Sequence, residues 1–189
     1  MSHERQASPA GTTYIALLRG INVGRARQVA MDELRGIVAS LGFGDVRTLL
    51  RSGNLVFTGP TQSVRDVAAA LERAIATHLA LRVGVVVRTS AELADVVAAN
   101  PLPEAVNDRT FLHVMFLAQP LTAGEGALLD PEQFLPDVVR CSEREIYVWY
   151  RHGMSGSRTA EQLDRRLETL ATDRNWNTVT KLQALATGT

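Results

Sequence analysis

Short apolar runs alternate along the first half of the chain with segments in which apolar residues recur at helical spacing. Residues 13–21 form an apolar run typical of a buried strand, and apolar positions at i, i+3, i+4 and i+7 from Leu34 predict a helix. The predicted elements are a strand at 13–21, a helix at 31–41, strands at 46–51 and 54–58, a helix capped by Ser63 that runs to Leu79, and a strand at 83–88. This order, β-α-β-β-α-β, is that of a split βαβ unit.

The second half repeats the pattern after a connecting helix. Thr89 and Glu92 form a capping box that opens this helix, and Asn100-Pro101 ends it. There follow a strand at 111–118, a short helix that contains Leu128, Leu129 and Phe134, a hairpin of 138–141 with 145–151, a helix at 160–171 and a last helix at 178–186. We therefore predict an α+β fold: tandem ferredoxin-like α/β sandwiches, whose strands could continue as one antiparallel sheet, with an extra C-terminal helix.

The predicted domain organisation has three parts. Residues 1–12 are polar and form a disordered tail, residues 13–88 form the first ferredoxin-like half, and residues 89–189 form the second α/β half with the C-terminal helices. The N-terminal segment has no apolar core of a secretory signal, and no run approaches the ~18 apolar residues of a membrane span. With a single cysteine, these features predict a cytoplasmic protein without disulfides or membrane contact.

Three polar blocks interrupt this hydrophobic pattern at the ends of predicted elements: Arg19–Gly24, Arg51–Asn54 and Arg174–Thr178. In each, an arginine is followed by small or amide residues, which can supply a positive charge, backbone N–H groups and amide donors to an anion. The same composition is typical of turns and helix caps. The candidate ligand-binding residues are Arg19, Gly20, Asn22, Gly24, Arg51, Ser52, Gly53, Asn54, Arg174, Asn175, Trp176, Asn177, Thr178 and Lys181.

Each block also has a purely structural interpretation, which the sequence leaves open. The first lacks the spacing and the lysine of a P-loop, so its two glycines can equally form a strained turn. The second satisfies a hairpin turn by itself. In the third, Asn175 or Asn177 can cap the last helix while Trp176 docks it on the sheet. A fourth loop, Gly153–Arg158, has the composition of an anion site or of a flexible linker.

Four runs carry a resemblance to a known family: YIALLRGINVG at 14–24, MDELRGIVASLGF at 31–43, DVRTLLRSGNLVF at 45–57 and RNWNTVTKL at 174–182. With them the chain resembles the domain-of-unknown-function family 1697. Members often carry lysines and a second glycine after the first block, where this chain has Arg25-Ala26-Arg27. The resemblance implies a compact bacterial α/β fold and no established activity.

The usual catalytic constellations are missing from the sequence. The four histidines are scattered, no H-E-x-x-H occurs, and no metal site is predicted. His113 is expected to be a satisfied core or edge residue, and Cys141 a packing residue. The cofactor, if any, is unknown.

Three functions remain open on this basis. The first is binding of a phosphate-bearing ligand, a nucleotide or a nucleic-acid backbone, in a cleft lined by arginine and asparagine. The second is a phosphoryl-transfer or hydrolytic enzyme that uses the same cleft. The third is a structural protein that acts through partner or homo-oligomer contacts, with the blocks serving only as turns and caps. Convergence of the blocks in space would favour the first two.

Overall fold

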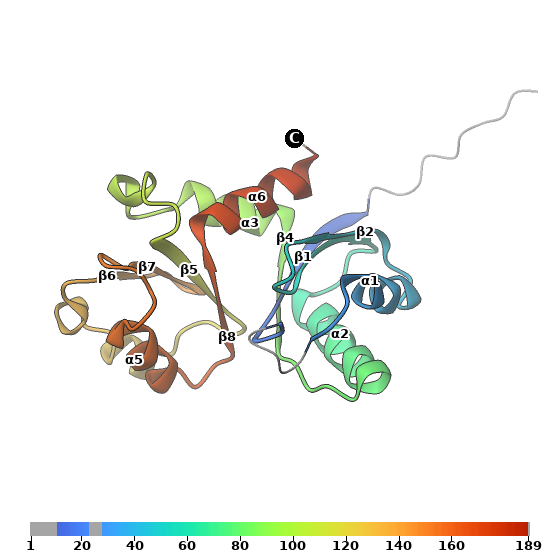
Figure 1. Cartoon of the computed structure of the whole chain (residues 1–189), viewed down its shortest axis with the longest axis horizontal. Helices are drawn as coiled ribbons and strands as arrows, with labels where there is room; N and C mark the ends of the chain where they lie inside the picture. The colour runs from blue at the N-terminus through green and yellow to red at the C-terminus, as the bar shows by residue number, and fades with distance from the viewer. Residues whose placement is uncertain (1–10, 23–27, 189) are drawn as a thin grey trace, which may run out of the picture.

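The computed structural model describes residues 11–22 and 28–188 of the chain. Its first half contains β1 (Thr12–Leu18), α1 (Met31–Ser40), β2 (Gly44–Leu49), β3 (Asn54–Gly59), α2 (Val64–Leu79) and β4 (Val85–Thr89). The four strands form one antiparallel sheet in the order β2-β3-β1-β4. The two helices cover one face of this sheet (Figure 1).

The second half is built in the same order. It contains α3 (Ser90–Ala98), β5 (Leu112–Leu117), α4 (Ala123–Ala127), β6 (Val138–Cys141), β7 (Glu145–Trp149), α5 (Arg158–Arg166), β8 (Ala171–Asn175) and α6 (Trp176–Thr187), with short 3₁₀ turns at Pro103–Ala105 and Pro131–Phe134. Its strands form a second antiparallel sheet in the order β6-β7-β5-β8. The chain is therefore an α+β protein with two antiparallel four-stranded sheets.

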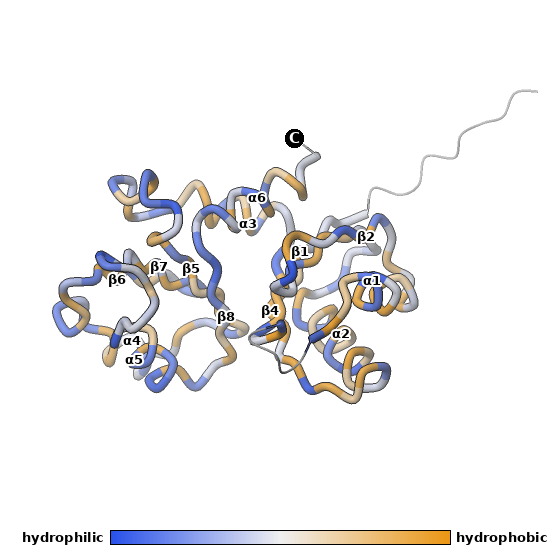
Figure 2. The backbone as a smooth tube through the Cα atoms, viewed as in Figure 1, coloured by the Kyte–Doolittle hydropathy of each residue, from blue (hydrophilic) through white to orange (hydrophobic). Residues whose placement is uncertain are grey.

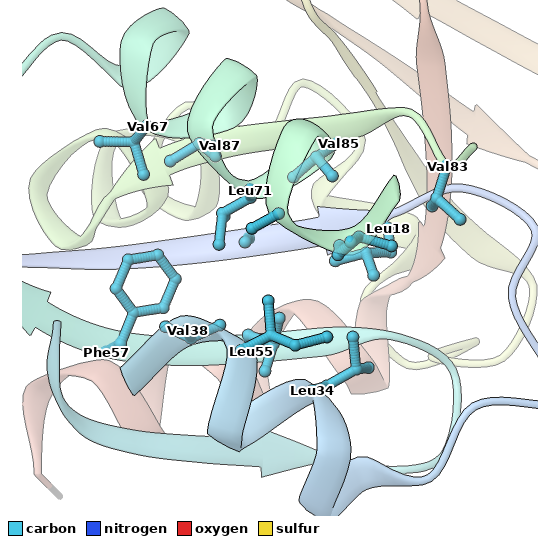
Figure 3. Close-up of a cluster of buried hydrophobic side chains, with 14 of the residues drawn as sticks. Leu18, Leu34, Val38, Leu55, Phe57, Val67, Leu71, Val83, Val85 and Val87 are labelled. Atoms are coloured by element: carbon cyan, nitrogen blue, oxygen red, sulfur yellow. The ribbon is translucent and has the colours of Figure 1, made fainter. Parts of the chain in front are cut away.

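Among the residues that the structure describes, three hydrophobic clusters hold these layers together. The first fills the space between the first sheet and helices α1 and α2; Leu34 of α1 and Leu71 of α2 point there toward Leu55 of the sheet (Figure 3). The second lies between the two halves and includes residues of β1, β5, α3 and α6. The third lies beneath α5 in the second half. The shared central cluster fixes the two halves against each other.

Several predictions from the sequence need correction. The helix expected at 160–171 ends at Arg166, and the residues that follow lead into β8, a strand that the sequence did not predict. Figure 2 shows why: β8 is mostly hydrophilic, in contrast to β4, and its sequence ATDRN has no apolar run. The short helix expected around Leu128 is instead α4 followed by a 3₁₀ turn.

Two other expectations are wrong. The strands do not continue as one sheet, because β4 and β8 are edge strands of separate sheets. Cys141 is exposed and does not serve packing. Within the described residues, none of the helices has both the length and the apolar content to cross a lipid bilayer.

Candidate functional site

A cleft of about 700 Å³ lies between the two halves, where the end of β1 and the β2–β3 turn face β8 and α5. Residues of all three polar blocks line it: Arg19, Gly20 and Ile21 from the first, Ser52 from the second, and Arg174, Asn175 and Thr178 from the third. The other lining residues are Leu18, Leu50, His113, Met115, Met154, Ala160, Glu161, Asp164, Ala171, Thr172 and Asp173. Blocks more than 100 residues apart in the sequence thus meet at one place.

In the first block, Asn22 fastens the loop that follows β1. Its amide Nδ2 donates to the carbonyls of Val29 (3.1 Å) and Arg51 (2.6 Å), and its Oδ1 accepts from the Val29 N–H (2.7 Å). Both Gly20 (φ 66°) and Asn22 (φ 56°) adopt the left-handed conformation that this path requires. Asn22 therefore acts on the loop and on the turn at Arg51 and does not line the cleft. The candidate residue Gly24 lies outside the described residues.

In the second block, Gly53 holds the β2–β3 turn against the end of β1. Its carbonyl accepts from the Leu18 N–H at 2.9 Å, and its φ is 71°. A Cβ atom at Gly53 would lie 2.8 Å from side-chain atoms of Leu18 and Ile21. Arg51 of this block is exposed and Asn54 is fully buried, and neither lines the cleft.

Gly53→Ala is expected to lower the free energy of unfolding by about 3 kcal/mol, because it combines left-handed strain with overpacking of Leu18 and Ile21. Gly42→Ala is the matched control, since Gly42 also has positive φ (86°) but has no atoms within 4 Å of the added Cβ. Urea denaturation should show a loss of about 1 kcal/mol for the control. Equal losses in the two variants would mean that the close approach contributes nothing.

In the third block, the Arg174 side chain crosses from β8 into the first half. Its Nε donates to Asn54 Oδ1 (2.5 Å), and its Nη2 donates to the carbonyls of Leu18 (2.8 Å) and Ser52 (3.3 Å). Its Nη1 donates to Thr172 Oγ1 (2.8 Å) and to the Asp173 carbonyl (2.6 Å). Arg174 of the third block thus reaches the end of β1 and the second block, and it directs each of its donors to a protein acceptor.

Burial lowers the pKa of Arg174 to about 10, against the opposing attraction of Asp173. Because this pKa is still well above neutrality, the side chain carries a positive charge inside the protein. Its hydrogen-bond acceptors are an amide, a hydroxyl and carbonyl groups, all neutral.

The rest of the third block serves mainly to place α6. Asn175 caps the helix by accepting from the Thr178 N–H at 2.9 Å, and Trp176 is buried in the central cluster. The N–H of Asn177 donates to the Arg109 carbonyl at 3.2 Å. Lys181 is exposed and does not line the cleft. The expected cap and docking roles of Asn175 and Trp176 are confirmed.

His113 and Asp173 form an ion pair on the wall of the cleft, with His113 Nδ1 2.5 Å from Asp173 Oδ1. The other ring nitrogen, Nε2, lies 3.0 Å from the Thr110 carbonyl. Burial by itself lowers the pKa of His113, but the hydrogen bond and the charge of Asp173 outweigh it, so the pKa lies above its ordinary value of 6.5. Since both ring nitrogens face acceptors, His113 donates from both when it is protonated. Its burial and its hydrogen bonds confirm the expectation of a satisfied core or edge residue.

A second arginine, Arg88 of β4, makes the reverse crossing into the second half. It is 1% exposed; its Nε donates to Glu145 Oε1 (3.0 Å), and its Nη2 donates to the carbonyls of Leu117 (2.9 Å) and Arg144 (3.1 Å). Arg88 lies in the last strand of the first half and immediately precedes Thr89, the N-cap of α3. Arg174 lies in the last strand of the second half and immediately precedes Asn175, the N-cap of α6. Desolvation lowers the pKa of Arg88, and the Glu145 carboxylate opposes this effect.

The two crossings correspond in position. Leu18 and Leu117 both end the first strand of their half, and their N–H groups donate at 2.9 Å to the hairpin carbonyls of Gly53 and Arg144. The next residue along each hairpin is Asn54 in one half and Glu145 in the other. Arg174 and Asn54 are therefore equivalent in position to Arg88 and Glu145, with the amide of Asn54 in place of the Glu145 carboxylate.

This replacement leaves the charge of the two arginines unequally balanced. The Glu145 carboxylate neutralises Arg88, whereas Asn54 cannot neutralise Arg174. Asp173, whose negative charge acts on Arg174, is itself paired with His113. A buried arginine without a carboxylate partner is costly. One positive charge therefore remains on the wall of the cleft.

At the mouth of the cleft, Arg19 forms an ion pair with Asp164 of α5, across the two halves. Both side chains are well exposed, at 43% and 58%. The cleft is also lined by residues that the sequence did not mark as candidates, among them His113, Met115, Asp164 and Asp173. The first two lie in a predicted strand and Asp164 in a predicted helix, whereas Asp173 immediately precedes the third block.

A model of the family described as "Protein of unknown function (DUF1697)" matches residues 12–147. Among solved structures, a conserved bacterial protein of Streptococcus pneumoniae, SP0830, is similar in fold, with a TM-score of 0.75 and 24% sequence identity over 94% of this chain and 99% of that one. No curated protein matches the sequence.

Proposed function

Since the chain belongs to the family of proteins of unknown function DUF1697, which assigns it no activity, we propose that it binds a phosphate-bearing small molecule of the nucleotide class in the cleft between β1 and β8. The observation that carries the proposal is the buried positive charge of Arg174 on the wall of that cleft, which has no carboxylate hydrogen-bond partner among the described residues. An anionic ligand would supply the negative charge that Glu145 supplies to Arg88.

The charges in the cleft favour an anion after pairing is taken into account. Arg19 is balanced by Asp164, and His113 by Asp173, which leaves Arg174 in excess. Glu161 lies at the rim with Arg165 one helical turn away, at 4.0 Å. Because a cleft wall of low dielectric strengthens the field of a buried charge, Arg174 attracts an anion even though its N–H groups are engaged.

The size and the apolar lining of the cleft favour a ligand with an organic body. Small-molecule sites usually enclose ~300–1,000 Å³, and this cleft has about 700 Å³. Leu50 and Met154 line it from opposite halves, and both side chains are exposed. They offer apolar contact to a base or sugar, while Arg19 is placed to meet the phosphate.

We also propose that the two halves are tandem ferredoxin-like units and that the protein acts in a bacterial cytoplasm. Each half has the element order β-α-β-β-α-β, and the two strand orders are equivalent, which supports tandem ferredoxin-like units. The exposed free Cys141 supports a reducing cytoplasm, and the similarity to a Streptococcus pneumoniae protein supports a bacterial setting.

A catalytic role has less support. Both ring nitrogens of His113 face acceptors, so this histidine has no free lone pair with which to act as a base. Within residues 11–22 and 28–188, histidine, cysteine and acidic side chains form no cluster of three that could hold a metal ion. Binding without chemistry is the simpler proposal.

A thermal-shift screen tests the proposal. The compounds are AMP, GMP, ribose 5-phosphate, inorganic phosphate and a short single-stranded oligonucleotide. At ~100 times its dissociation constant, a bound ligand adds about 2.7 kcal/mol of stability and raises the melting midpoint. A response to the oligonucleotide alone would replace the small-molecule proposal with nucleic-acid binding, and no response to any compound would overturn both.

Arg19→Ala is expected to weaken binding of the responding nucleotide by about tenfold or more, because it removes one charge-assisted contact to phosphate. The fold should be little affected, since an exposed ion pair contributes about 0–1 kcal/mol. The control is Arg73→Ala, an exposed arginine on α2 that does not line the cleft. Calorimetric titration that gave unchanged affinity for Arg19→Ala would remove Arg19 from the site.

A further inference from the structure

The edge of β8 that faces the cleft has a close counterpart in the first half. The Arg19 N–H donates to the Gly84 carbonyl at 2.9 Å, and the Ala118 N–H donates to the Leu170 carbonyl at 2.8 Å. These equivalent bonds fix the register, so that Val85, which begins β4, corresponds to Ala171, which begins β8.

The N–H groups of both residues point away from their own sheets. In an antiparallel pair, alternate residues bond to the neighbouring strand, and the residues between them direct their N–H and C=O groups to the other side. The bonded pairs include residues 84 and 170, so Val85 and Ala171 present their N–H groups at free edges.

In the first half, the chain itself covers this edge with a carboxylate. Glu72 of α2 accepts from the Val85 N–H through Oε1, at 2.8 Å. Both residues line a smaller cleft of about 210 Å³. This cleft is the counterpart of the larger one, because it also lies between a helix, an edge strand and the first-strand end of the other half.

Helix α5 carries the corresponding acid. Leu71 of α2 and Leu163 of α5 are both fully buried, and the next residue along each helix is Glu72 or Asp164. The cleft-lining positions agree with this alignment, since Ala68 of α2 corresponds to Ala160 of α5.

Asp164, however, does not cover the edge of β8. It pairs with Arg19, a residue whose equivalent in the second half is Ala118, which has no charge to offer Glu72. No side chain in the described ranges accepts from the Ala171 N–H. In the larger cleft, therefore, Arg19 pairs with Asp164, the acid that would otherwise accept from the edge of β8. The Ala171 N–H is left without an acceptor among the described residues.

We infer that Arg19 and the Ala171 N–H form the oxyanion subsite of the cleft, and that Asp164 is an internal competitor which the ligand's anionic group displaces from Arg19. The ligand oxygen takes the place on Ala171 that the Glu72 carboxylate takes on Val85. This inference rests on the proposed function and adds two points to it: the position of the anion, and the competition of Asp164 with the ligand for Arg19.

The test is a gain of affinity, which misfolding does not imitate. Asp164→Ala frees Arg19 and is expected to tighten binding of AMP by about tenfold, as measured by calorimetry. The matched control is Glu161→Ala, which removes an acid from the same helix and the same cleft without freeing Arg19. Its affinity should change much less.

A second readout locates the anion. Titration with inorganic phosphate should shift the Ala171 amide resonance, whereas that of Val85, already covered by Glu72, should stay in place. A parallel titration with acetate separates phosphate recognition from binding of any carboxylate: a shift with both anions assigns a general oxyanion subsite, which the inference also predicts.

The outcomes distinguish this inference from the proposed function. If AMP binds to the wild type but Asp164→Ala leaves its affinity unchanged or weaker, the subsite is wrong and the proposed function stands. Tighter binding in both alanine variants would mean that the effect is one of net charge, and it would overturn the competitor role of Asp164. If AMP binds to neither wild type nor Asp164→Ala, the proposed function fails as well.

Discussion

Replacing Arg88 with alanine is expected to lower the free energy of unfolding by about 3–5 kcal/mol near neutral pH. The guanidinium is 1% exposed, and the variant leaves the Glu145 carboxylate buried without its donor. The carbonyls of Leu117 and Arg144 also lose their partner. Urea denaturation monitored by circular dichroism measures the change.

Arg174→Ala is the informative comparison, because it removes an arginine that also bridges the two halves but leaves no buried carboxylate without its partner. Its main acceptors are neutral, so the expected loss is smaller, about 2 kcal/mol. Arg73→Ala, on the exposed side of α2, should change stability by less than ~0.5 kcal/mol. If Arg174→Ala destabilised the protein as much as Arg88→Ala, the two arginines would not differ in charge compensation.

The second large effect is expected on binding. Asn54→Asp gives Arg174 the carboxylate partner that Arg88 has in Glu145, and it thereby cancels the excess charge of the cleft. Two unit charges about 8 Å apart at an effective dielectric of about 20 interact by about 2 kcal/mol. Affinity for a nucleotide that binds the wild type should therefore fall by about thirtyfold in calorimetric titrations.

Asn54→Ala separates charge from hydrogen bonding. Like the aspartate variant, it removes the Nδ2 donor that bonds to the Leu49 carbonyl and to Ser52 Oγ, each at 3.0 Å. Asn54→Ala should therefore lower stability, because these hydrogen bonds are lost. It should keep most of the affinity for the nucleotide, because it adds no negative charge. Equal loss of affinity in the two variants would show that Asn54 acts by shaping the turn and not through the charge of Arg174.

Local patterns in the sequence were sufficient for most of the fold. Helical spacing from Leu34, the Ser63 cap and the Thr89 capping box each predicted an element that the structure contains. The strand β8 was missed because its buried positions are two small residues, Ala171 and Thr172, and its remaining side chains are polar. Its pairing with β5 is a tertiary property that no local pattern reports.

The candidate site was predictable in composition but not in geometry. The three blocks were visible because arginine, glycine and asparagine interrupt apolar runs, and seven of their residues line the cleft. That Arg174 reaches Asn54 depends on how the halves pack, as does the pairing of Arg19 with Asp164. The equivalence of Asn54 and Glu145 was hidden because it is one of hydrogen-bond position, with no visible identity in the flanking sequence.

A crystal structure of the protein with AMP would show whether the cleft binds the nucleotide. We expect electron density for AMP in the cleft between β1 and β8, with its phosphate at Arg19. Density for AMP at any other place on the surface, or an empty cleft at a concentration that saturates binding in solution, would contradict this expectation.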